Sequence, residues 1–275
     1  MTQLQRVIKY LAIAFAIVLA VSIVFGIIGG IGMIFGLGKD GNDMLLEESI
    51  DINVSQAITS LDIEVEAAEL KIVEGDSFSL SSNIKDLRVN EKNGVLSISQ
   101  KRKNVTKIGI HTSKAGEIVL TVPSGVSFDK VEIDARAGDI NISALVANKV
   151  SFDFGAGKVS INHIEVTDWA DIDTGAGMLA IGDGSIKNLD LDLGVGKTVL
   201  KASLVGRSDI DCGVGATELK LLGNREDYTL IVNSGIGSIS IDGDYANGNS
   251  TFGNGANVVN IDGGVGSIDI TFEND

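Results

Sequence analysis

Asp192-Leu-Gly-Val-Gly-Lys-Thr-Val-Leu200 is one version of a nine-residue phrase that recurs along this chain of 275 residues. Other versions span residues 134–142, 153–161, 173–181, 211–219, 233–241 and 262–270, and the first of them carries Arg136 in place of its first glycine. The second glycines are Gly138, Gly157, Gly177, Gly196, Gly215, Gly237 and Gly266, so the steps are 19, 20, 19, 19, 22 and 29 residues. A repeat close to 20 residues predicts a solenoid, in which each coil stacks on the one before it.

Each coil has the alternation of a β-strand. Leucine and aspartate alternate over residues 189–193, which predicts a strand with one buried face. A second short strand is expected after the glycines, and a weaker third segment, such as 164–166 or 204–205, closes the coil. The predicted fold class is all-β, a single-stranded β-helix or solenoid with coils of about 19–20 residues. The alternative is a β-sandwich, but sandwiches do not repeat one phrase in register.

A sharp corner is predicted at the two glycines of each phrase. Glycine adopts positive φ and leaves room for the coil above it, so the second glycines are expected to be structural. The apolar residue between the glycines is expected to point inward, and these residues are Ala156, Ala176, Val195, Val214, Ile236 and Val265.

The first 49 residues differ in kind from the rest. Residues 10–37 contain no charged side chain, and as a helix they would extend about 42 Å, more than the ~30 Å of a bilayer core. We therefore predict one transmembrane anchor at 10–37, a short cytoplasmic N-terminus at 1–9 and a linker at 38–49. A cleaved signal peptide is the alternative, but its apolar region is usually only about 7–15 residues long. Arg6 and Lys9 precede the apolar stretch, which predicts a single-pass plasma-membrane protein with its N-terminus inside and residues 40–275 outside the membrane.

The extracytoplasmic part, 50–275, is predicted to have two kinds of coil. Over residues 131–275 the coils are regular, and residues 242–252 interrupt them as a polar, glycine-rich insertion. Residues 50–130 are degenerate, although 64–72 echoes the phrase with Ala68 in place of the glycine. We expect them to form irregular capping coils, because the end of a solenoid must cover an open hydrophobic face. Asn93-Gly94 signals a hairpin turn within this part.

Residues 117–128 (EIVLTVPSGVSF) lead into 131–142 (VEIDARAGDINI), which gives a strand, the only proline of the chain and then the glycine coils. This pattern resembles the central signature of a bacterial domain family of unknown function that carries the label "putative adhesin". The resemblance covers roughly residues 50–275. It implies a β-solenoid exposed at the cell envelope, usually behind a membrane helix, and it implies no catalytic residues.

Charge and cysteine content exclude several partners. The whole chain has 22 basic and 37 acidic residues. Residues 1–40 contain three basic residues and one acidic residue, so 19 basic and 36 acidic residues remain beyond residue 40, a net charge of −17. Such a surface repels nucleic acid and anionic lipid. Cys212 is the single cysteine, which excludes an internal disulfide, and its strand position predicts a buried thiol.

An acidic ladder is the one weak candidate for a metal site. Neighbouring coils would place its carboxylates about 4.8 Å apart. The ladder consists of Asp134, Asp153, Asp173, Asp192 and Asp211, and a second column holds Asp171, Asp190 and Asp209. It can be interpreted as a cation-binding site or as a solvated face that keeps the strands soluble. We favour the solvated face and therefore expect no cofactor and no metal.

Two further motifs only approximate known sites. The run 194–198 (GVGKT) ends like a P-loop, but Leu191 stands where the first glycine is required, and a strand rather than a helix should follow. The run 263–266 (GGVG) lacks the aspartate spacing of calcium-binding repeats.

Catalysis needs a local cluster of acids with a basic or histidine partner, and neither His111 nor His163 has an evident partner in the sequence. The predicted function is therefore that of a non-catalytic, membrane-anchored envelope protein, an adhesin-like or scaffold module whose partner is an envelope protein or a glycan. A carbohydrate-active β-helix enzyme is the alternative, and Trp169 would be its sugar-stacking residue.

Overall fold

The computed structural model describes residues 45–55, 57–100, 116–246 and 248–274, with side chains from residue 51 onward. Over this part of the chain the fold is all-β: seventeen strands form one mixed sheet, and the only helical segment is the single 3-10 turn η2 (Arg225–Asp227). The all-β prediction is confirmed. Residues 10–37, the predicted transmembrane anchor, lie outside the described residues, and within those no helix has the length and hydropathy needed to span a bilayer.

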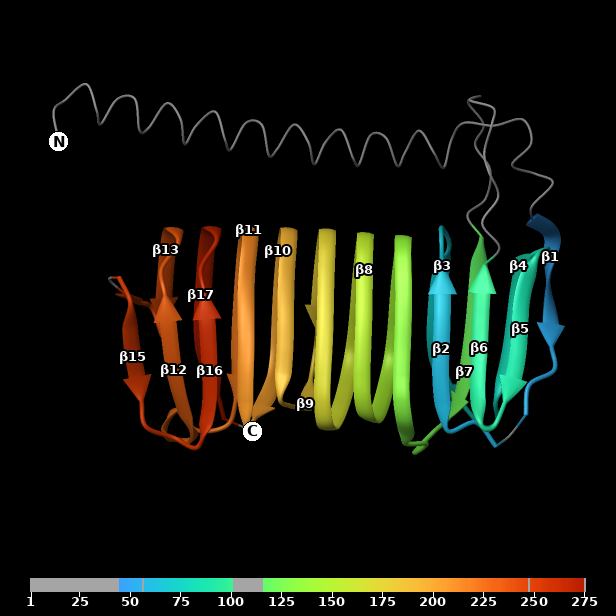
Figure 1. The fold of residues 1–275 in the computed structure, drawn as a ribbon, viewed down its shortest axis with the longest axis horizontal. Coiled ribbons are helices and arrows are strands. Elements are labelled where there is room, and N and C mark those ends of the chain that lie inside the picture. The colour runs from blue at the N-terminus through green and yellow to red at the C-terminus, as the bar shows by residue number, and fades with distance from the viewer. Residues whose placement is uncertain (1–44, 56, 101–115, 247, 275) are drawn as a thin grey trace, which may run out of the picture. The chain divides into compact units, whose positions relative to one another are not determined.

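The central coils stack in sequence order (Figure 1). They comprise β8 (Phe128–Ile181), β9 (Gly184–Lys187), β10 (Leu189–Val205) and β11 (Arg207–Leu222). Pairing is parallel and in register: Gly196 of β10 pairs with Gly177 of β8 on one side and with Gly215 of β11 on the other. The weak third segment is confirmed as a strand, because residues 203–205 pair with 185–187 and residues 164–166 pair with 184–186.

The C-terminal coils stack out of sequence order. The last coil, β16 (Asn257–Asp262) and β17 (Val265–Glu273), pairs with β11 on one side and with β12 (Tyr228–Asn233) and β13 (Ile236–Ile241) on the other. Gly215 therefore pairs with Gly266, which in turn pairs with Gly237. The expectation that every coil stacks on the coil before it in sequence is wrong here. The two longest spacings between second glycines, 22 and 29 residues, fall in this part of the chain.

The insertion over residues 242–252 explains this order. It contributes β14 (Asp244–Ala246) and β15 (Ser250–Gly253), which pair antiparallel with the outer edges of β13 and β12. Short antiparallel strands protect an open sheet edge from pairing with other chains. Because they occupy the outer edge, the chain returns on the inner side, where the longer β17 finds a partner on both of its edges.

The N-terminal end is built in the same way. The first coil, β2 (Ser60–Val65) and β3 (Glu69–Gly75), lies between β8 and the second coil, β6 (Val95–Gln100) and β7 (Glu117–Pro123). Antiparallel strands again cover the outer coil: β5 (Leu87–Lys92) pairs with β6, β4 (Ser79–Ile84) pairs with β7, and β1 (Leu45–Ile52) pairs with β4. The predicted hairpin at Asn93-Gly94 joins β5 to β6, and both residues have positive φ.

One hydrophobic core runs through the whole stack. Each coil contributes inward aliphatic side chains at the same register positions, for example Ile172, Leu191 and Ile210, all at most 1% exposed. Since every inward position repeats in the next coil, the outward positions repeat too, and like residues form straight columns on the surface.

Candidate functional site

The predicted acidic ladder is a real column and is longer than predicted. Asp192 pairs in register with Asp173 and with Asp211, and the step between glycines carries the column back through Asp153 to Asp134. Two further acids extend it: Glu64 pairs with Asp134, and Asp262 pairs with Asp211. The sequence offered signals for both, because 64–72 echoes the phrase and 262–270 repeats it, but both belong to coils that stack out of order.

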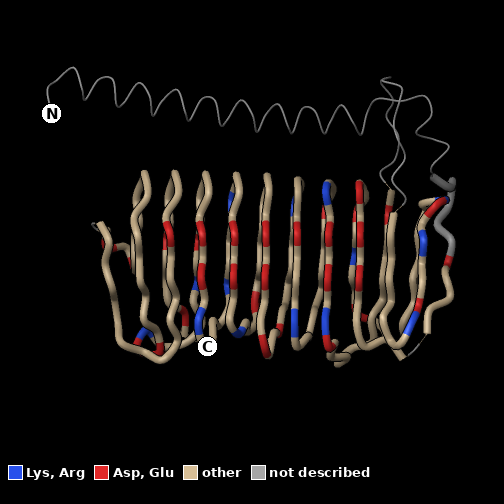
Figure 2. The backbone as a smooth tube through the Cα atoms, viewed as in Figure 1, with Lys and Arg blue, Asp and Glu red and all other residues tan. Residues whose placement is uncertain are grey.

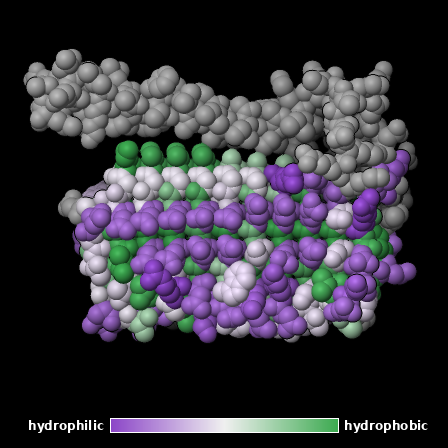
Figure 3. All heavy atoms as spheres, viewed as in Figure 1, coloured by the Kyte–Doolittle hydropathy of each residue, from purple (hydrophilic) through white to green (hydrophobic). Residues whose placement is uncertain are grey.

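A second acidic column, interrupted at Ser151, runs parallel to the first and two residues earlier in the coils. Asp190 pairs with Asp171 and with Asp209, and toward the N-terminal end Asp62 pairs with Glu132. Figure 2 shows the two columns as red bands that cross the coils. Figure 3 shows the same two bands as hydrophilic rows on the face toward the viewer.

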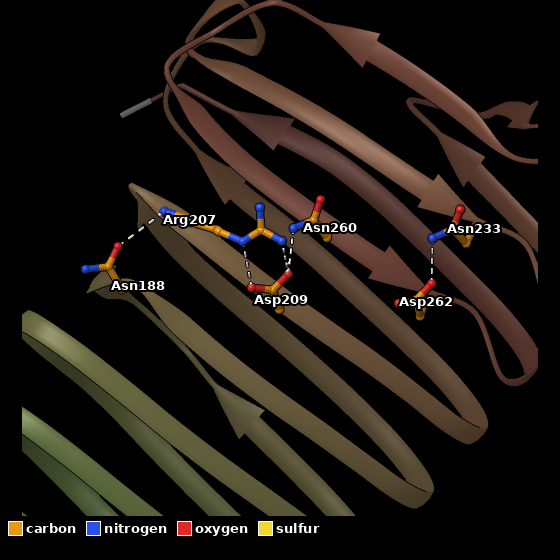
Figure 4. Close-up of polar contacts among 6 residues, drawn as sticks. All are labelled: Asn188, Arg207, Asp209, Asn233, Asn260 and Asp262. Atoms are coloured by element: carbon orange, nitrogen blue, oxygen red, sulfur yellow. Dashed lines mark hydrogen bonds and ion pairs between the residues drawn. The ribbon is translucent and has the colours of Figure 1, made fainter.

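Neutral or basic donors end both columns on the C-terminal side (Figure 4). Asn260 Nδ2 donates to Asp209 Oδ1 at 2.6 Å, and Asn233 Nδ2 donates to Asp262 Oδ1 at 2.6 Å. Arg207 also forms two hydrogen bonds to the Asp209 carboxylate, at 3.1 and 3.0 Å. At the next position of each column, an asparagine that donates a hydrogen bond stands where another carboxylate would continue the column.

The ionisation of the carboxylates follows from these contacts. Partial burial, and then the neighbouring carboxylates, raise the pKa values of Asp173, Asp190 and Asp211. The Arg207 guanidinium instead lowers the pKa of Asp209, with help from Asn260. The middle of the array therefore carries unrelieved repulsion, whereas the end at Asp209 is neutralised.

The carboxylates of the columns do not converge on one point. Among the described residues no group of three or more His, Cys, Asp or Glu side chains converges as a cation would require. In a straight column each carboxylate has its neighbours above and below, and no carboxylates approach from a facing element. The geometry suits a continuous negative surface better than a single ion.

His163 has partners that the sequence did not indicate. Its Nδ1 lies 3.2 Å from Asp183 Oδ2 and its Nε2 lies 3.5 Å from Glu165 Oε1. The expectation that this histidine lacks an acidic partner is wrong, because Asp183 comes from the next coil, 20 residues later. All three side chains are well exposed, between 39% and 57%. His111 lies outside the described residues, and Trp169 is half-buried.

The corner glycines are packed against main chain. The seven second glycines have φ between 132° and 154°. A Cβ built on Gly196 would lie 1.8 Å from the carbonyl oxygen of Gly177, and equivalent contacts of 1.7–2.0 Å recur at the other six. No side chain fits at such distances, so each of these glycines is required by both its backbone conformation and the coil beneath it.

The apolar residue between the glycines does not point inward. Ile236 is 55% exposed, and Val195, Val214 and Val265 are half-buried on the outer side of the corner. Leu193 and Thr198 supply the inward side chains, with four residues between them. Alternation of faces cannot hold across these four residues. Because Val195 faces outward and alternation is regular from Val195 to Thr198, the break lies between Leu193 and Val195, at Gly194.

A half-open pocket with about 50 Å³ of free space runs along the corner, and the corner glycines and the residues between them help to line it. Its inward side chains come in facing pairs, and the pair Cys212–Thr217 is smaller than Leu193–Thr198 or Thr174–Leu179. Cys212 is half-buried rather than fully buried, and burial raises the pKa of its thiol. At the same corner Lys197 Nζ binds Glu218 Oε1 at 2.8 Å and β10 continues as a strand, so this run does not form a P-loop.

Comparisons with known proteins give a family. The model of the Toastrack DUF4097 family matches residues 48–270. No curated protein matches. A solved structure of a "putative cell adhesion protein" from Clostridium sporogenes is 18% identical; the alignment covers 82% of this chain and 99% of that chain, with a TM-score of 0.36.

Two further solved structures are of proteins described as "putative adhesin". The one from Parabacteroides distasonis is 15% identical, covers 81% of this chain and 96% of its own, and has a TM-score of 0.41. The one from Bacteroides fragilis is 16% identical, covers 82% and 98%, and has a TM-score of 0.32. The family model spans most of the chain and includes every residue of the two acidic columns, and on that match this chain belongs to the Toastrack DUF4097 family.

Proposed function

We propose that this chain is a non-catalytic, membrane-anchored protein of the cell envelope that presents a rigid, acidic β-solenoid outside the membrane as an adhesin-like or scaffold module. The observation that carries the proposal is the pair of carboxylate columns held in register by parallel coils. Binding by such a surface needs no movement of the backbone, since the sheet fixes the spacing of the residues that carry the carboxylates before a partner arrives.

The stack supports a rigid display. Each coil is bonded along both edges to its neighbours, and the outer coils are covered by short antiparallel strands. A continuous core beneath the columns keeps the coils in register. A partner that recognises a 4.8 Å repeat of charge would therefore meet the same spacing along the whole face.

The uncharged stretch 10–37 supports the membrane anchor, and Arg6 and Lys9 support an N-in, C-out topology in the plasma membrane. Protease added to intact spheroplasts should remove a C-terminal tag. A tag that stays protected until the cells are lysed would overturn this topology.

Crosslinking and pull-down from intact membranes test the binding surface. The variant Asp173→Asn, Asp192→Asn, Asp211→Asn should lose most of the captured partner, because it removes three charges from the centre of one column. The matched control Asp76→Asn, Asp129→Asn, Asp244→Asn removes three exposed acids away from the columns and should retain the partner. Equal capture of the partner by the two variants would show that the acidic columns are not the binding surface and would overturn that part of the proposal.

The alternative is a carbohydrate-active enzyme, and His163 with Glu165 and Asp183 is the cluster that favours it. Because the three side chains are well exposed on an outer face, they lack the enclosure that general acid–base chemistry uses. Release of reducing sugar from envelope glycan by the wild-type chain, lost in His163→Ala, would establish the enzyme and overturn the non-catalytic proposal.

A further inference from the structure

An apolar ridge runs along the glycine corner. Register pairing joins Ala176 to Val195, Val195 to Val214, Val214 to Val265 and Val265 to Ile236, and the stacked glycines on either side of Ala156 add that residue. We call these six residues the corner ridge. Figure 3 shows a hydrophobic row at the edge where the coils turn.

The stack does not require these side chains to be apolar. The glycines on each side are explained by contact with the coil beneath, but the residue between them points away from the core. All six coils carry alanine, valine or isoleucine there, and Ile236 is 55% exposed. A contiguous apolar row at the surface, with one member exposed and the others half-buried, is a candidate contact surface.

The shape of the corner is complementary to itself. A column of glycines lies on either side of the ridge, so the surface consists of a narrow apolar crest between two shallow grooves without side chains. When two such surfaces are offset sideways by one residue, the crest of each enters a groove of the other. A bilayer is a poorer fit, because the ridge has no aromatic side chain and an acidic column runs beside it.

Charge selects one orientation. The acidic column of Asp153 to Asp262 borders the ridge on one side. Lys158 and Lys197 border it on the other, and Lys197 Nζ also binds Glu218 Oε1 at 2.8 Å. A two-fold axis along the stack brings the acidic border of each copy opposite the lysine border of the other. A two-fold axis across the stack would instead place acid against acid. The first arrangement also keeps the same ends of both copies together.

We propose that two copies of this chain associate side by side in parallel through the corner ridge. Five steps of about 4.8 Å make the ridge about 24 Å long, and three residues at about 3.3 Å make it about 10 Å wide. This area is well below the ~800 Å² per partner of a stable interface, so the association is weak in solution. It depends on confinement in the membrane, which raises the effective concentration, and in this respect it rests on the proposed anchor.

Disulfide crosslinking of the full chain in its membrane tests the pairing. In a Cys212→Ser background, Ile236→Cys and Val214→Cys should each form a disulfide-linked dimer with the same residue of the second copy under mild oxidation. Tyr245→Cys is the control, because Tyr245 is 74% exposed and lies off the ridge, so random collision would favour it. We expect several-fold more dimer at the two ridge positions than at residue 245.

A second variant tests the orientation. Lys158→Glu, Lys197→Glu should reduce the Val214→Cys dimer several-fold, because both lysine borders become acidic, and unchanged yield would overturn the parallel two-fold. Equal yield at residues 236 and 245 would overturn the ridge contact. A lipid-sensitive fluorophore at Ile236→Cys that shifts to the blue without dimer would assign the ridge to the bilayer instead. If protease mapping shows that the chain is not anchored, the same crosslinking in concentrated solution still tests the ridge alone.

Discussion

The central coils and the two ends of the stack obey the same register but a different order. From β8 to β11, each coil lies on the coil that precedes it in sequence. At each end the terminal coil lies inside and its sequence neighbour lies outside, covered by antiparallel strands. The repeat phrase therefore specifies how two coils fit together, and it leaves open which coils become neighbours.

The largest effect is expected at a central corner. Gly196→Ala should lower the free energy of unfolding by far more than Gly125→Ala, because both glycines have positive φ but only Gly196 faces a carbonyl oxygen at 1.8 Å. Backbone strain alone costs about 1–3 kcal/mol, and that is the cost expected at Gly125. Thermal unfolding of fragment 40–275 measures both variants.

Gly125 is open to solvent, with nothing within 4 Å of an added Cβ, so the pair separates strain from stacking. Similar losses in the two variants would show that the coils do not pack as closely at the corner as described.

A smaller effect on stability is expected from Asp→Asn substitutions, and its sign should differ between the middle of the acidic columns and their neutralised end. Burial and neighbouring acids raise the pKa of Asp173, so its folded state holds the proton more tightly, and the carboxylate destabilises the fold as pH rises above its usual range. Arg207 lowers the pKa of Asp209, so that carboxylate stabilises the fold above its usual range and loses the effect as pH falls. At neutral pH, Asp173→Asn should raise the melting temperature and Asp209→Asn should lower it.

Melting curves between mildly acidic and neutral pH make the contrast sharper. The gain from Asp173→Asn should shrink as the pH falls toward the raised pKa, because the wild-type carboxylate is then protonated. A shift of the same sign in both variants would contradict the difference between the middle and the end of the array.

The smallest effect is that of salt. Two unit charges at about 4.8 Å repel by roughly 1 kcal/mol in water, and salt at about 0.15 M screens only beyond ~8 Å, so added salt should raise the melting temperature slightly. Calcium chloride and sodium chloride at matched ionic strength should act equally if the columns form a screened face. An excess with calcium that disappears in Asp173→Asn, Asp192→Asn would indicate a cation site.

The sequence predicted what repeats and missed what depends on neighbours from elsewhere in the chain. Strand parity, the corner glycines and the carboxylate column follow from spacing alone, because equivalent residues of successive coils must coincide. The partner of His163 was missed because Asp183 belongs to another coil. Val195 was predicted to point inward because strict alternation was assumed across the corner, whereas the alternation breaks between Leu193 and Val195.

The order of the end coils could not be predicted from the phrase. Residues 262–270 fit equally well against 211–219 and 233–241, since all three present the same edge. The choice is made by the segment 242–252, which occupies the outer edge as β14 and β15. Its content of glycine and polar residues indicated an insertion, but it gave no indication of which edge would be covered.

Deletion of the last coil tests this order. Fragment 40–255 lacks β16 and β17, and hydrogen exchange can follow the amides of β12 and β13 in it. Because the last coil bridges β11 to β12 and β13, its removal should expose those amides while β8 to β10 stay protected.

Because the fragment leaves one edge of β11 free, the intact chain decides between the two orders. In a Cys212→Ser background, Asp209→Cys with Asn260→Cys, whose parent side chains lie 2.6 Å apart, should form a disulfide under mild oxidation, and Asp209→Cys with Ile231→Cys should not. A disulfide in the second pair and none in the first would mean that β12 stacks directly on β11 in sequence order, which would contradict the account.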